Sequence, residues 1–189
     1  MRFVPFVMLL GLLYGCAARE VITFDIPPQK STLMVVDERP DIERNYGGCR
    51  DHGYGWYGVS DEAFKTSRVE LLRARLHAAL GDKIKNVQVR HFQNCFQRNS
   101  SSGAAAFAGI SYVLALAIDA AHKRGDDLLM TYIDISVDGH PVIAADLRSI
   151  KSDQLWAGLS RQKPTIDLIV QSSEAAITQA IANIRDRIK

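Results

Sequence analysis

An Asp-Gly pair at residues 138 and 139 restricts the fold more than any other feature of the chain. It separates two apolar runs, LLMTYIDISV at 128–137 and HPVIAADLRSI at 140–150. An Asp-Gly pair in this position is a strong signal for a tight hairpin between antiparallel strands. The fold must therefore accommodate an antiparallel hairpin in its C-terminal half.

Two amphipathic segments predict helices. The first opens at Ser60, with Asp61 and Glu62 in its first turn, and ends at Gly81. Its arginines, including Arg68, are expected mostly off the apolar stripe. The second helix is expected from about residue 165 to residue 188.

Further strands are predicted on both sides of the first helix. Residues 33–36 form an apolar run that ends in charges and Pro40, and residues 112–118 alternate after a small-residue linker at 101–110. Residues 21–26 are interpreted as a short edge strand or an extended tether. In the strand around residues 87–95, alternation places five side chains on one face: Val87, Val89, His91, Gln93 and Cys95. The order of elements predicts an α+β fold, with a mainly antiparallel sheet of four to five strands and two main helices on one face.

The N-terminus has the pattern of an export signal. Arg2 is followed by an uncharged apolar run up to Leu13, which is too short to span a bilayer as a helix and suits the core of a signal peptide. The sequence LYGC at residues 13–16 resembles the lipobox of bacterial lipoproteins, in which the cysteine is acylated and becomes the first residue. We therefore expect a signal peptide at 1–15, a lipidated N-terminus and tether at 16–30, and a single periplasmic domain at 31–189. Lipidation of Cys16, palmitate included, would hold the protein on the membrane.

The resemblance to lipoproteins also implies a destination. Ala17 follows the cysteine, whereas an Asp there usually signals retention in the inner membrane. We therefore expect an outer-membrane protein that faces the periplasm. The formal net charge of +2 gives no basis for nucleic-acid binding.

The three cysteines become informative once Cys16 is assigned to the lipid. The remaining pair, Cys49 and Cys95, is expected to form a disulfide in the oxidising periplasm. The alternative is a metal site, because His52 and His91 complete C-x2-H and H-x3-C spacings. An extended strand would separate His91 from Cys95 by roughly 13 Å, which weighs against one zinc ion binding both.

The glycine-rich stretch GGCRDHGYGWYG, residues 47–58, is expected to be a long loop. Its last glycines fit G-x-G-x-x-G, but no strand leads directly into them and no acidic residue follows at the required distance, so no nucleotide cofactor is predicted. Its aromatic residues either bind a partner or cover the edge of the sheet. The candidate partner-binding residues are Tyr46, Tyr54, Trp56 and Tyr57.

No catalytic motif is present. The sequence contains neither G-x-S-x-G nor H-E-x-x-H, and DISVDG at 134–139 lacks the final Glu of a calcium loop because Ala145 occupies that position. We therefore predict no catalytic residue, cofactor or resident metal. A cell-wall hydrolase would have to depend on residues such as Asp37 or His52.

Together, the lipobox, the sequence MVVDERPD at 34–41, the basic amphipathic helix, the Asp-Gly meander and the C-terminal helix resemble small Gram-negative lipoproteins of the YajG type. The likeness covers nearly the whole chain. The chain departs from the pattern of these lipoproteins in its loop at 49–58 and its linker at 101–110. It implies an outer-membrane location and an α+β domain. We expect a non-catalytic binding or scaffold module for another envelope component, such as a protein, peptidoglycan or a glycolipid. The alternatives are a lipid or glycan carrier and a cell-wall hydrolase.

Overall fold

The computed structural model describes residues 21–28, 31–49, 56–97, 127–150 and 163–188. Within these ranges the chain forms a five-stranded sheet of β1 (Met34–Asp37), β2 (Trp56–Gly58), β3 (Asn86–Gln97), β4 (Asp127–Val137) and β5 (His140–Ile150). The strand order is β1-β3-β4-β5, and β2 pairs with β3 beyond the end of β1. The pairing of β1 with β3 is parallel, and the other pairings are antiparallel. The predicted α+β class and mainly antiparallel sheet are confirmed.

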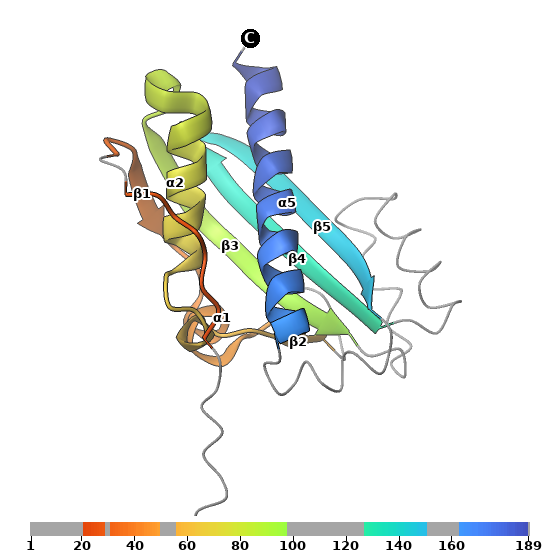
Figure 1. Cartoon of the computed structure of the whole chain (residues 1–189). Helices are drawn as coiled ribbons and strands as arrows, with labels where there is room; N and C mark the ends of the chain where they lie inside the picture. Colours follow the sequence, from red (N-terminus) through yellow and green to blue (C-terminus); the bar gives the residue numbers. More distant parts are fainter. Residues whose placement is uncertain (1–20, 29–30, 50–55, 98–126, 151–162, 189) are drawn as a thin grey trace, which may run out of the picture.

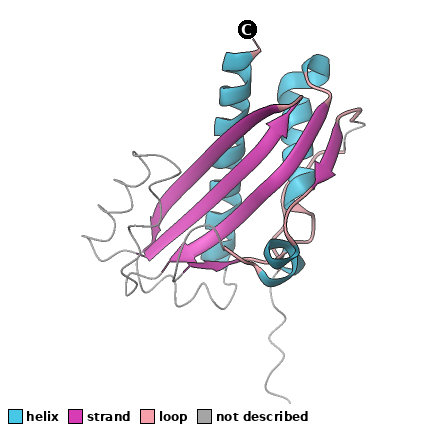
Figure 2. Ribbon diagram, turned by 180° about the vertical axis from the view of Figure 1, so that it is seen from behind, coloured by secondary structure: helices cyan, strands magenta, loops and turns pink. Residues whose placement is uncertain are grey.

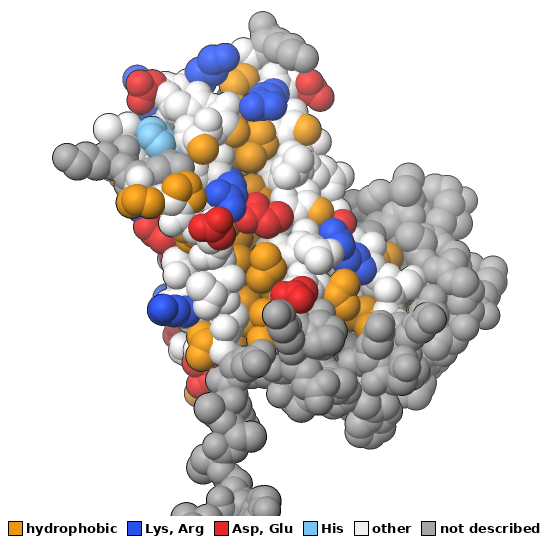
Figure 3. Space-filling model, in the orientation of Figure 1, with side chains coloured by type: hydrophobic (Ala, Val, Ile, Leu, Met, Phe, Trp, Pro, Cys, Tyr) orange, Lys and Arg blue, Asp and Glu red, His pale blue; other side chains and the backbone are white. Residues whose placement is uncertain are grey.

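The two long helices, α2 (Arg68–Leu80) and α5 (Lys163–Arg187), cover one face of the sheet (Figure 1). The remaining helices are short: α1 (Asp41–Tyr46) and the 3₁₀ turns η3 (Asp61–Ala63) and η4 (Gly81–Lys83). The main core lies between the long helices and the sheet and contains Leu71, Leu72, Leu76, Phe92, Ile133, Ile135 and Ile177. Hydrophobic side chains are visible between the helices in Figure 3, with charged side chains across the middle. None of the described helices is long and apolar enough to span a membrane.

The β4–β5 turn confirms the hairpin expected from Asp138 and Gly139. Both residues have positive φ, 48° and 86°, as a type I′ turn requires. The Asp138 carboxylate also accepts hydrogen bonds from the backbone N–H groups of Lys85 and Asn86. This side chain therefore ties the turn to the start of β3.

The first long helix begins later than predicted. Residues 61–63 form only a 3₁₀ turn, Phe64 is extended, and α2 starts at Arg68 because the Ser67 hydroxyl caps the N–H groups of Val69 and Glu70. The expectation that Arg68 lies off the apolar stripe is wrong, since this side chain is fully buried.

A bulge in β3 corrects the predicted face of that strand. The register shifts between Val89 and His91, so that Arg90 is an extra residue in the ladder with β4. Val87 and Val89 belong to the helix-covered core, whereas Cys95 belongs to a second cluster on the opposite face. The five residues predicted to share one face are therefore divided between two.

Residues 21–28 do not join the sheet, so of the two alternatives predicted for residues 21–26 the edge strand is wrong. Ile22 forms an isolated bridge with Phe64, and Ile22 and Phe24 are buried in the main core. The core thus includes side chains that precede residue 31. The signal peptide, Cys16, the strand expected at 112–118, His52 and Tyr54 lie outside the described residues.

Candidate functional site

The outer edge of β3 holds most of the residues that the sequence singles out. Here β1, α1 and β2 follow one another along the strand, and the Cys49–Cys95 disulfide attaches the segment after α1 to β3. The presence of this disulfide confirms the predicted bond between Cys49 and Cys95. Because the two sulfur atoms are bonded to each other, they are not available as thiolate ligands, and the metal site that included these cysteines is excluded.

Two glycines allow the chain to cross itself beside this disulfide. A Cβ atom on Gly58 would lie 1.9 Å from the carbonyl oxygen of Gly47 and 2.8 Å from the Cys49 sulfur. Gly47 also ends α1 with a φ of 63°, a left-handed conformation that glycine adopts without steric cost. The segment after α1 is therefore pressed directly onto β2.

The aromatic residues of this region have different environments. Tyr46 is 81% exposed and Tyr57 is 59% exposed, and each directly precedes one of the crossing glycines. Trp56 is only 8% exposed and packs in the second core cluster with the disulfide, Met130 and Tyr132. Trp56 thus covers the sheet, whereas Tyr46 and Tyr57 present their rings to solvent.

Glu43 attaches α1 to a stretch of β3 that neither β1 nor β2 pairs with. Its side chain is almost completely buried, and one carboxylate oxygen accepts a 2.9 Å hydrogen bond from the backbone N–H of Phe92. The other oxygen lies 2.9 Å from the Gln93 amide nitrogen and 3.0 Å from His91 Nδ1. One carboxylate therefore replaces part of the missing neighbouring strand.

An ionic cluster built on two buried arginines, Arg39 and Arg68, lies next to Glu43. Arg39 forms a bidentate pair with Asp37, donates two hydrogen bonds to Asp61, and has a guanidinium nitrogen 3.7 Å from the Glu43 carboxylate. Asp61 also accepts a 2.7 Å hydrogen bond from Arg68. The cluster joins the end of β1, α1, η3 and the start of α2.

Burial and charge act against each other on the pKa values of this cluster. Burial alone would raise the pKa of Asp37 and of Asp61, but the arginines that bond to them outweigh it and hold both pKa values below their usual range. Burial is also the largest influence on Arg68 and lowers its pKa, whereas the two aspartates raise the pKa of Arg39 against the effect of burial. Asp37 is therefore a structural anion, and this is a poor setting for a general acid.

The ionic cluster was not anticipated from the sequence. Asp61 and Arg68 lie far along the chain from Asp37, Arg39 and Glu43, and no helix was predicted at residues 41–46. One local signal was available, because Pro40, the acidic residues Asp41 and Glu43, and Gly47 match the start and stop signals of a short helix.

The same edge carries a group of exposed apolar side chains. Among the described residues, exposed large apolar side chains on β1, α1 and β2 are Met34, Val36, Ile42, Tyr46 and Tyr57. We call Ile42, Tyr46 and Tyr57 the aromatic edge. The described residues contain no group of histidine, cysteine and acidic side chains placed to hold a metal ion.

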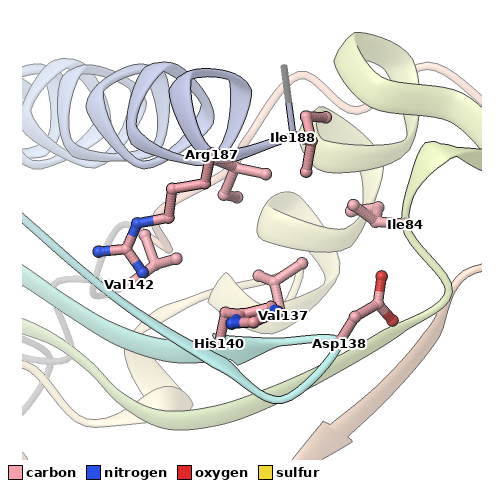
Figure 4. A pocket seen from close by; sticks show the side chains of 8 residues that line it. Ile84, Val137, Asp138, His140, Val142, Arg187 and Ile188 are labelled. Atoms are coloured by element: carbon pink, nitrogen blue, oxygen red, sulfur yellow. The ribbon is translucent and has the colours of Figure 1, made fainter.

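A separate cavity of about 300 Å³ lies where the C-terminal end of α5 meets the β4–β5 turn (Figure 4). Its walls are formed mainly by Ile84, Val137, Val142 and Ile184. Two of its polar lining residues are engaged in the fold, since Asp138 binds backbone N–H groups and Arg187 donates to the carbonyl oxygen of Pro141.

Comparisons with known proteins do not assign the chain to a family. No family model matches it, and neither a curated protein nor a solved structure does. The functional argument therefore depends on the geometry of the chain itself.

Proposed function

We propose that the protein is a membrane-anchored periplasmic lipoprotein of the outer membrane, similar to the YajG type. Its folded domain acts as a non-catalytic binding or scaffold module for another component of the cell envelope. The observation that carries the binding role is the exposure of Tyr46 and Tyr57 on a segment that is fixed by a disulfide and by a backbone crossing.

Rigidity is what makes this edge suitable for binding. A side chain that is already held in place loses less conformational entropy when a partner binds, so more of the contact energy appears as affinity. Tyrosine rings supply a large contact area with few rotatable bonds. Glu43, the disulfide and the Gly47–Gly58 crossing hold the backbone beneath the aromatic edge.

Site-specific photocrosslinking in the intact envelope tests the binding role. A photoreactive residue at position 46 or 57 should capture the same envelope component, whereas one at Ile143 or Ile188 should not. Both control side chains are exposed and lie outside the aromatic edge. Equal capture at all four positions would contradict a specific surface.

The lipid anchor rests on the lipobox LYGC and has its own test. Mass spectrometry of the mature protein should find Cys16 acylated at the new N-terminus. A Cys16→Ser variant should lose acylation and leave the membrane fraction. An unmodified Cys16 within an uncleaved chain would contradict the anchor without affecting the binding role.

The cavity favours one second candidate, carriage of a lipid or glycan. Its apolar walls suit a short aliphatic group, and its volume of about 300 Å³ is at the lower end for small-molecule sites. Native mass spectrometry of the purified protein would reveal a retained ligand. A Val142→Trp variant that filled the cavity should release it.

A further inference from the structure

The two outer edges of the sheet differ in what covers them. Along β5, the side chains of α5 bond to the outward backbone groups: Gln179 accepts from the N–H of Ala145, and Asn183 and Arg187 donate to the carbonyl oxygens of Ile143 and Pro141. The spacings agree, because four helical residues rise by about 6 Å and two strand residues by about 6.7 Å. From Pro141 to Ala145, this edge is closed within the chain.

The β1 edge has no such cover among the described residues. The backbone N–H groups of Met34 and Glu38 point toward β3, where they donate hydrogen bonds to the carbonyl oxygens of Lys85 and Val89. Because backbone groups alternate along a strand, those of Val35 and Asp37 face away from β3. No described residue pairs with them, and β1 is the outermost strand of the sheet (Figure 2).

The side chains at this edge are apolar as well as exposed. Met34 is 61% exposed and Val36 is 44% exposed. Val35 packs against the main core, so the alternation places Met34 and Val36 on the face of the sheet opposite to the helices. An open edge with exposed apolar side chains is a template for pairing with another strand.

We propose that β1 pairs antiparallel with β1 of a second copy of this chain, with the two-fold axis beside Val35. In this register Met34 lies opposite Val36 of the second copy, and the reverse pair follows by symmetry. Asp37 lies opposite Leu33 and Glu38 opposite Thr32, so no like charges meet. The edge is thus complementary to itself, which favours a second copy over a foreign strand.

The dimer is weak, because β1 has only four residues. It is independent of the aromatic edge, so either proposal can fail without the other. Sedimentation velocity of the whole chain in detergent, over a wide concentration range, should show a reversible monomer–dimer equilibrium. Amide exchange at Val35 and Asp37 should slow as the concentration rises.

Two variants test the register. Val36→Asp should weaken dimerisation about tenfold, because it removes both symmetric Met–Val pairs at once. Ile143→Asp is the matched control, since Ile143 is 47% exposed on the closed edge, and it should leave the equilibrium unchanged. Val35→Pro removes an outward N–H and also changes a side chain that packs against the main core. It should abolish the dimer and leave the β1–β3 hydrogen bonds in place, with a loss of stability that urea denaturation measures.

The outcomes are distinct. A monomer at every concentration would overturn the proposal, as would a dimer that neither Val36→Asp nor Val35→Pro weakens. Amide exchange at Val35 could also slow only when an unrelated extended peptide is added. That result would show that a foreign strand occupies the edge, and it would overturn the proposed dimer.

Discussion

A carboxylate oxygen of Glu43 accepts a 2.9 Å hydrogen bond from the backbone N–H of Phe92, on the side of β3 opposite to β4, where this stretch pairs with neither β1 nor β2. Through this contact the six-residue helix α1 packs against the edge of the sheet, where a neighbouring strand would otherwise lie. Helices this short are not stable alone, so the position of α1 depends on such tertiary contacts. The position of the aromatic edge therefore depends on the buried side chain of Glu43.

Replacement of Glu43 should loosen this edge. Glu43→Ala leaves the Phe92 N–H and the nearby Arg39 without their buried carboxylate, and we expect a loss of about 3 kcal/mol in the free energy of unfolding. Urea denaturation measures the loss, and faster amide exchange at Phe92 locates it. Asp41→Ala, on the exposed side of the same helix, should change stability by less than about 0.5 kcal/mol. Equal effects of the two substitutions would contradict the role of Glu43.

A methyl group at the glycine crossing should be strongly destabilising. In Gly58→Ala the new Cβ would lie 1.9 Å from a backbone oxygen, which cannot move aside without displacing the segment after α1. We expect a loss of at least about 3 kcal/mol. Gly81→Ala provides the control for backbone strain, because Gly81 has a φ of 56° and a ψ of −136° and no atom lies within 4 Å of an added Cβ. Its loss should come from backbone strain alone, about 1–3 kcal/mol. Calorimetry that found Gly58→Ala as stable as Gly81→Ala would refute the close crossing.

The disulfide should stabilise the fold as well as fix the edge. It closes a loop with a sequence separation of 46, for which chain entropy predicts about 4 kcal/mol. A Cys49→Ala, Cys95→Ala double variant should lose a comparable free energy of unfolding and show faster exchange around Gly47. An unchanged denaturation midpoint would mean that the disulfide does not contribute to the free energy of unfolding.

The ionic cluster predicts acid sensitivity of a defined sign. The pKa values of Asp37 and Asp61 are lower in the folded state, so the unfolded chain binds more protons at low pH. Their stabilising contribution is complete above the unfolded pKa of about 3.9 and is lost as the pH falls through the lower folded values. Asp61→Asn should therefore flatten the decrease in unfolding free energy below about pH 4. A decrease as steep as in the wild type would contradict the assignment.

The elements with strong local signals could be predicted from the sequence, and the contacts between distant elements could not. Asp138 and Gly139 specify their turn by themselves, and the two cysteines specify their bridge once Cys16 is set aside. The bulge at Arg90 leaves no mark in the alternating pattern. The pairing of Arg68 with Asp61 depends on burial that helical periodicity did not indicate. For Trp56 the sequence left open whether it binds a partner or covers the sheet, and only the pairing of β2 with β3 places it in the cluster with the disulfide.

The most direct test of the binding role is the affinity of the photocrosslinked partner for a Tyr46→Ala, Tyr57→Ala double variant. Both rings are exposed, so the variant should denature at the same urea concentration as the wild type. We predict that its dissociation constant rises at least about tenfold, since such aromatic anchors commonly contribute 1–2 kcal/mol or more each. An Ile143→Ala, Ile188→Ala control should bind as the wild type does. A double tyrosine variant with unchanged affinity would contradict the account.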